Sequence, residues 1–192
     1  MNAETLPLSH NESPIFGFWV YLMSDCLLFA ALFATYAVLH GNTFGGPGTE
    51  IYGLPYVFAE TMCLLFSSFF AGLGLLSAYR RKKGTTIAWF SLALVLGLVF
   101  LGLEAHEFAT LIMEGDGPSR SGFLSSYFVL VGTHGLHVTA GALWMLLNLA
   151  HTAREGVTEK NIRRLTLVSY FWHFLDLIWI GIFTIVYLFG IM

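Results

Sequence analysis

Two histidines, His134 and His137, lie three residues apart inside the long uncharged apolar stretch 122–150. Residues with this spacing share one face of a helix, so both imidazoles would point the same way. Such a pair supplies half of a metal site, and His173 could complete a bis-histidine haem. The chain has no Cys-x-x-Cys-His and no His-Glu-x-x-His pattern. Proton or hydrogen-bond chemistry is therefore favoured over a metal or a haem.

Three carboxylates also lie inside apolar runs: Asp25, Glu60 and Asp176. A carboxylate near the centre of a bilayer costs on the order of 3 kcal/mol or more unless it is paired or protonated. At about 1.5 Å of rise per residue, Asp25, Asp176 and the three histidines fall at similar depths in their spans. We expect Asp25 or Asp176 to lie within hydrogen-bond reach of a histidine, where a proton, a water or a phospholipid headgroup could bind. The alternative is that each group separately bonds a serine, a threonine or a backbone carbonyl.

A second polar group is expected nearer the opposite, outer ends of the spans. Glu60 lies about 8 Å from the start of its span, and Glu104, His106 and Glu107 lie where the following apolar run ends. Glu104 and Glu107 are interpreted as outer-end carboxylates, either solvated or part of a buried site. Glu60 is either an interfacial carboxylate that reaches water or a buried functional one.

The elements that must position these groups are membrane-spanning helices. Of the 192 residues, 56% are hydrophobic and 11% are charged, against roughly a quarter charged in soluble domains. Apolar runs of at least about 18 residues predict spans over 15–39, 55–79, 86–107, 122–150 and 165–190. The predicted fold is all-α, with a polar N-terminal tail (1–14) followed by one five-helix transmembrane domain (15–192).

Small residues follow the face of the fourth span that carries the histidines. They are Gly132, Gly135, Thr139 and Gly141. Small side chains let two membrane helices approach closely, so this face is predicted to pack against another helix and not against bulk lipid.

The positive charges predict how the chain is oriented. With five spans, the N-terminus shares one side of the membrane with the second and fourth loops. That side would hold eight of the nine Lys and Arg residues, and the other side only Arg120. Basic loops stay in the cytoplasm, which predicts a cytoplasmic N-terminus and a C-terminus outside.

Three ordered motifs resemble the haem–copper oxidase subunit III family. Residues 16–26 (Phe-Gly-Phe-Trp-Val-Tyr-Leu-Met-Ser-Asp-Cys) resemble the first-helix signature of its cytochrome o ubiquinol oxidase branch. Residues 132–138 resemble the family's Gly-x-His-Gly-x-His-Val motif, and 171–179 resemble Trp-His-Phe-x-Asp-x-x-Trp in its last helix. Five spans and the aspartate at position 25, where cytochrome c oxidases usually have glutamate, favour the quinol oxidase branch.

This resemblance implies a non-catalytic subunit of a proton-pumping terminal quinol oxidase in the bacterial inner membrane. No catalytic residue, haem or metal would belong to this chain, whereas haem and copper would lie in the partner, subunit I. Bound phospholipid and a role in assembly and sustained proton uptake are also implied. Three alternatives stay open: subunit III of a cytochrome c oxidase, an independent proton-coupled carrier, and a haem carrier.

Overall fold

The computed structural model describes residues 13–43 and 53–188, which are helical apart from the turns. Five helices in this part are long and apolar enough to cross a membrane. They are α1 (Ser13–Leu39), α2 (Leu54–Tyr79), α3 (Lys83–Met113), α4 (Gly122–Glu155) and α5 (Glu159–Ile182). α5 continues into a π-helical turn, η2 (Phe183–Leu188). The predicted all-α architecture with five spans is confirmed.

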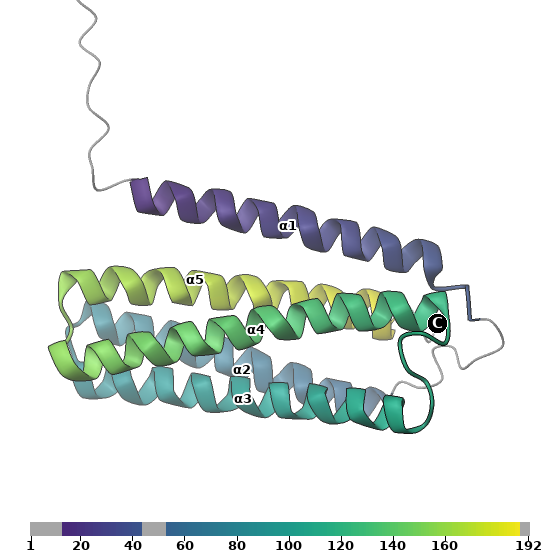
Figure 1. The fold of residues 1–192 in the computed structure, drawn as a ribbon. Coiled ribbons are helices and arrows are strands. Elements are labelled where there is room, and N and C mark those ends of the chain that lie inside the picture. The colour runs from purple at the N-terminus through teal and green to yellow at the C-terminus, as the bar shows by residue number, and fades with distance from the viewer. Residues whose placement is uncertain (1–12, 44–52, 189–192) are drawn as a thin grey trace, which may run out of the picture.

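The helices run in alternating directions, with α2 to α5 grouped together and α1 along one side (Figure 1). α2 and α4 each pack against both α3 and α5. α1 contacts α4 and, to a smaller extent, α5. Large apolar side chains are exposed on all five helices, as expected for surfaces that meet lipid or a neighbouring subunit.

Two short turns lie at the end of the molecule where α1 begins (Figure 1). Residues 80–82 join α2 to α3, and Arg81 there has a φ of 55°. Gly156 ends α4 with a φ of 78°, a left-handed conformation that glycine adopts without a steric penalty. Thr158 then caps α5, because its Oγ1 accepts a hydrogen bond from the Asn161 amide at 3.3 Å.

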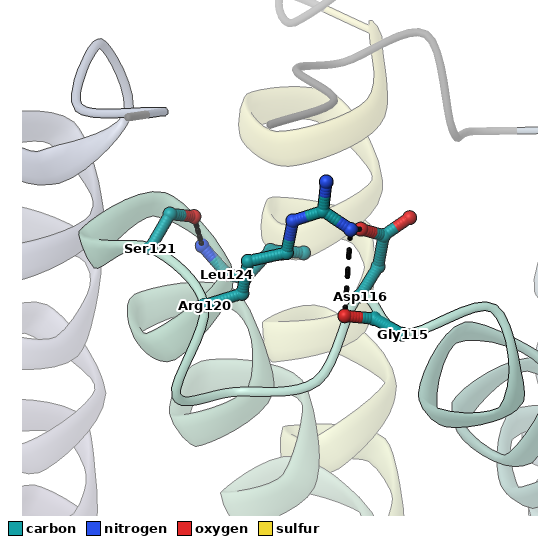
Figure 2. A network of polar contacts seen from close by, with 5 residues as sticks. All are labelled: Gly115, Asp116, Arg120, Ser121 and Leu124. Atoms are coloured by element: carbon teal, nitrogen blue, oxygen red, sulfur yellow. Dashed lines mark hydrogen bonds and ion pairs between the residues drawn. The ribbon is translucent and has the colours of Figure 1, made fainter. Parts of the chain in front are cut away.

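The loop between α3 and α4 is held by its own side chains at the opposite end (Figure 2). Arg120 donates to the Asp116 carboxylate and, at 3.4 Å, to the Gly115 carbonyl. The hydroxyl of Ser121 accepts a hydrogen bond from the Leu124 amide at 3.1 Å and so caps α4.

Polar side chains join the helices inside the apolar core. Trp172 of α5 donates from Nε1 to Ser67 Oγ of α2 at 3.0 Å. Ser67 in turn donates to the Ala93 carbonyl of α3 at 2.6 Å. Trp179 of α5 donates to Thr61 Oγ1 of α2 at 3.1 Å. These bonds satisfy groups that lipid could not, and they fix α5 against α2.

The helices extend beyond the predicted spans at several ends. α3 runs on to Met113, α4 to Glu155, and α5 already begins at Glu159, so the polar connection expected over 151–164 is mostly helical. Hydropathy marks where the apolar run ends, whereas charged residues such as glutamate and lysine continue a helix readily. The predicted tail, apart from residues 13 and 14, and the last two residues of the fifth span lie outside the described residues.

Candidate functional site

The first polar contact joins α1 to α4. Asp25 Oδ2 lies 3.6 Å from His137 Nε2, and both side chains are largely buried. His137 Nδ1 lies 2.7 Å from the Thr133 carbonyl, which can only accept, so Nδ1 carries a hydrogen. In a neutral ring, Nε2 is then a lone pair facing a carboxylate. The contact becomes attractive only when a further proton resides on Nε2 or on Asp25.

His134 lies one helical turn away and has different neighbours. It is fully buried, and its Nε2 lies 3.2 Å from the Leu175 carbonyl of α5. The rings of Trp179 and Phe100 enclose it, with centroids 5.1 and 5.8 Å from that of the imidazole. Nδ1 has no hydrogen-bond partner among the described residues. His134 therefore binds a backbone carbonyl on its own, which was the alternative to a shared polar layer.

His173 and Asp176 lie three residues apart on α5. His173 Nδ1 is 2.7 Å from the Ser169 carbonyl of its own helix. Asp176 has Ser68 of α2 and His173 as its polar neighbours. Its Oδ1 has no hydrogen-bond partner in the described part of the chain.

The expected mid-membrane layer is therefore split. Asp25 approaches His137 across a helix interface, but at 3.6 Å the two atoms are just beyond direct hydrogen-bond distance. His134 and Asp176 have separate partners on other elements. The prediction was that one of the two aspartates reaches a histidine, and Asp25 with His137 comes nearest to it. The other groups bond separately, because depth along a helix does not fix the direction in which each side chain points.

The outer carboxylates come together more closely than the sequence suggested. Glu60 of α2 has no exposed surface, and Glu104 of α3 is 4% exposed. Glu60 lies within electrostatic range of Glu107, and Glu104 lies within range of both. The interpretation of Glu104 as a solvated helix end is wrong, because α3 continues to Met113 and Glu104 is buried, whereas the nearby His106 is exposed.

Two tyrosines that sequence reasoning missed complete this group. Tyr127 of α4 donates to Glu107 Oε1 at 3.1 Å, and its hydroxyl lies 2.9 Å from that of Tyr187 in η2. A tyrosine hydroxyl inside a membrane span needs a partner, and this was the available signal. Glu60, Glu104, Glu107, Tyr127 and Tyr187 are called the acidic cluster below; they draw together α2, α3, α4 and η2.

Three glycines of α4 face other helices. A Cβ on Gly135 would lie 2.5 Å from Glu104 Oε1, and one on Gly132 would lie 3.5 Å from the Phe108 ring of α3. A Cβ on Gly141 would lie 3.0 Å from the Phe171 ring of α5. Thr139 was expected on this packed face, but its side chain is exposed and donates to the Gly135 carbonyl of its own helix. The buried side of α4 passes through Val138, and Thr139 is turned about 100° away from it.

An open groove of about 740 Å³ lies where the N-terminal part of α1 meets the end of α2 and the start of α5. Trp19 and Tyr170 line it with ring centroids 6.2 Å apart. Leu167 adds apolar surface, and Lys160 and Arg163 add two basic side chains. Glu159 lines the groove as well, so it combines an apolar lining with two basic side chains and one acidic side chain at one end of the helices.

The described residues contain no group of three or more His, Cys, Asp or Glu side chains that could hold a metal ion. Each membrane histidine already has one ring nitrogen bonded to a backbone carbonyl. The described part of the site thus consists of buried ionisable and hydrogen-bonding side chains.

Known proteins resemble this chain over nearly its whole length. A family model described as cytochrome c oxidase subunit III matches residues 10–191. The cytochrome bo(3) ubiquinol oxidase subunit 3 of Pseudomonas aeruginosa is 56% identical over 92% of this chain and 85% of its own length. The subunit 3 of the Pseudomonas putida cytochrome bo(3) ubiquinol oxidase is 49% identical over 94% of this chain and 88% of its own length. The probable quinol oxidase subunit 3 of Staphylococcus aureus is 40% identical over 92% of this chain and 89% of its own length. The chain therefore belongs to the cytochrome c oxidase subunit III family.

Proposed function

We propose that this chain is subunit III of a bacterial ubiquinol oxidase and lies in the inner membrane as a multi-pass protein. The observation that carries this is the 56% and 49% identity to two cytochrome bo(3) ubiquinol oxidase subunits 3. Five membrane-spanning helices agree with that location. The partners of the chain are the other subunits of the oxidase, and subunit I is the direct one.

The chain itself carries no redox centre, and haem and copper belong to subunit I. The surroundings of the histidines support this part of the proposal. His134 is enclosed by Phe100 and Trp179, which leaves no open side for a porphyrin. His137 donates Nδ1–H to the Thr133 carbonyl, and its other ring nitrogen, Nε2, already faces the Asp25 carboxylate at 3.6 Å.

The role of the subunit is to support assembly of the complex and sustained proton uptake by subunit I. The exposed apolar faces of the helices supply the surface for such an assembly, since α1 leaves Leu27 and Val38 uncovered. A complex that lacks this chain is expected to reduce oxygen at first and then to lose activity over repeated turnovers. The same activity loss with and without the chain would contradict this role.

A phospholipid is the ligand that we propose for the groove between α1 and α5. One acyl chain would lie against Trp19, Leu167 and Tyr170, and the phosphate would lie beside Lys160 and Arg163. Aromatic rings and basic side chains at the end of a membrane span are the groups that bind at the headgroup level. A headgroup could not reach Glu60 or His134, which are fully buried within the bundle.

The lipid is tested by mass spectrometry of the phospholipid that remains with the purified complex. Lys160→Gln with Arg163→Gln should lower the amount of retained phospholipid, because two charges that neutralise the phosphate are lost. Arg154→Gln, an exposed basic residue on α4 at the same end, is the matched control. Equal phospholipid retention in all variants would contradict the groove as a lipid site.

The identity of the complex is tested by purification through a tag on this chain. The proposal predicts that a haem- and copper-containing partner co-purifies and that the complex consumes oxygen with ubiquinol. Oxygen consumption with reduced cytochrome c and not with ubiquinol would indicate a cytochrome c oxidase. Purification without any partner would favour an independent carrier, and a haem spectrum from the separated chain would favour a haem carrier.

A further inference from the structure

Three carboxyl groups of the acidic cluster have buried oxygens, and no basic residue in the described part of the chain is in contact with them. Glu60 comes from α2, and Glu104 and Glu107 come from successive turns of α3. The only charged groups that act on Glu60 and Glu104 at short range are the other carboxyls of the cluster, within the described part of the chain. Arg120, in the loop after α3, is paired with Asp116.

Each element packed around the cluster supplies a hydroxyl or apolar group. α4 supplies Tyr127, and η2 supplies Tyr187. Tyr56 of α2 is the third hydroxyl, and it donates to the Leu103 carbonyl at 2.9 Å. His134 of α4 is directed away, toward the Leu175 carbonyl. Within residues 13–43 and 53–188, the surroundings thus contain no positive charge that would balance three carboxylates.

Four carboxyl oxygens of the cluster have no hydrogen-bond partner among the described residues. They are both oxygens of Glu60, Oε2 of Glu104 and Oε2 of Glu107. An ionised carboxyl can only accept hydrogen bonds, whereas a protonated one also donates. Protons are therefore the ligand that converts these acceptors into donors and removes the repulsion between neighbouring carboxylates.

The tyrosines decide where the remaining charge resides. Tyr127 donates to Glu107 Oε1 at 3.1 Å, and the Tyr187 hydroxyl lies 2.9 Å from the Tyr127 hydroxyl. Hydrogen bonds to a carboxylate stabilise its ionised form, so Glu107 is the member best suited to carry the negative charge. Glu60 accepts no such bond among the described residues and is the member best suited to hold a proton.

We propose that Glu60, Glu104 and Glu107 form a buried proton-binding site, in which Glu60 and Glu104 hold exchangeable protons and Glu107 carries the charge. This inference goes beyond assembly and lipid binding, because it assigns proton binding to this chain itself. The described residues of the site come from α2, α3, α4 and η2 of this chain.

Infrared spectroscopy of the purified complex tests the site, because a protonated carboxyl has a C=O stretch that an ionised carboxylate lacks. At neutral pH, Glu60→Gln and Glu104→Gln should each remove intensity equal to one protonated carboxyl. Glu114→Gln is the matched control, since Glu114 is an exposed glutamate at the end of α3. It should leave this band unchanged. If the protonated-carboxyl band kept its full intensity in both cluster variants, the proposal would be overturned.

Transfer of the wild-type complex to heavy water tests whether the protons exchange. The intensity assigned to Glu60 and Glu104 should shift to lower frequency, and the absence of a shift would overturn the proposal. Where a Gln variant does not assemble, Glu60→Asp keeps a carboxyl but changes its position. The protonated-carboxyl band should then move in frequency, and an unchanged band would again overturn the proposal. Neither measurement depends on ubiquinol or on oxidase activity.

Discussion

Gly97 of α3 lies against the rigid ring of Trp172 of α5, and Gly97→Ala should therefore destabilise the bundle. A Cβ at position 97 would lie 2.5 Å from Cζ2 and 2.8 Å from Cη2 of that ring. Carbon atoms pack best at about 3.5–4.0 Å, so one of the two helices must move by about 1 Å. The ring cannot turn aside freely, because its Nε1 donates to Ser67, which itself donates to the Ala93 carbonyl.

Overpacking of this kind typically costs about 1–3 kcal/mol. Alanine is more favourable than glycine within a helix by about 0.5–1 kcal/mol, and this gain in stability offsets part of the overpacking cost. Gly102→Ala isolates the gain, since Gly102 lies on the same helix and a Cβ there would have no neighbour within 4 Å. The two variants should therefore differ by about 1–3 kcal/mol. For a protein of this size that is about 2–12 °C in the melting temperature.

The assay is the temperature at which this chain is lost from the purified complex. Gly97→Ala should be lost at a lower temperature than Gly102→Ala. Trp172→Phe removes the two ring atoms that a Cβ at position 97 would touch, so the double variant should cost less than the sum of the two single ones. Equal temperatures for the two glycine variants, or strict additivity with Trp172→Phe, would refute the reasoning.

Four further single variants test three other contacts. Gly135→Leu should lower the amount of this chain in the purified complex, because the new side chain would collide with Glu104 of α3. Asp25→Ala and His137→Ala should each lower the melting temperature, because each removes a largely buried side chain from the α1–α4 contact, with a coupling of about 0.5–3 kcal/mol in a double-mutant cycle. Ser121→Ala should cost about 0.5–2 kcal/mol by removing the cap of α4, measured as a lower melting temperature.

Two of these predictions have a control variant close by in the chain. Gly132→Ala should leave the amount of assembled chain unchanged, since its Cβ would make ordinary contact at 3.5 Å. Ser119→Ala, at an exposed position in the same loop as Ser121, should leave the melting temperature unchanged. Normal assembly of Gly135→Leu would show that α3 and α4 can separate there. Additive effects of the Asp25 and His137 substitutions would show that 3.6 Å carries no interaction between them.

The number and order of the helices could be predicted from the sequence because lipid imposes long apolar runs on every span. The neighbours of each polar group could not be predicted in the same way. Glu104 follows the end of an apolar run in the sequence, yet α3 continues beyond it and α4 covers it through Gly135. Hydropathy reports depth in the membrane, whereas burial of a side chain depends on which helix lies beside it.

The direction in which each side chain points around its helix axis could not be predicted from the sequence either. His134 and His137 share one face by spacing, but His137 points to α1 and His134 points to the Leu175 carbonyl of α5. A face of α4 therefore meets two different helices within one turn. Counting residues places a group along the axis, and only the positions of α1 and α5 decide what it bonds.

The polar groups of this chain thus divide into two kinds with different consequences. His134 Nε2 and the indole Nε1 of Trp172 each contact one acceptor on another helix, so their hydrogen bonds connect the bundle. Glu60 and Glu104 instead lie close to each other. Both carboxyl oxygens of Glu60 and Oε2 of Glu104 have no hydrogen-bond donor among the described residues. Apolar replacement of two carboxylates would stabilise a bundle whose only task was to hold its shape. Since these two acids lie in well-packed helices and gain nothing from their charge, proton binding is the property that accounts for having acids there.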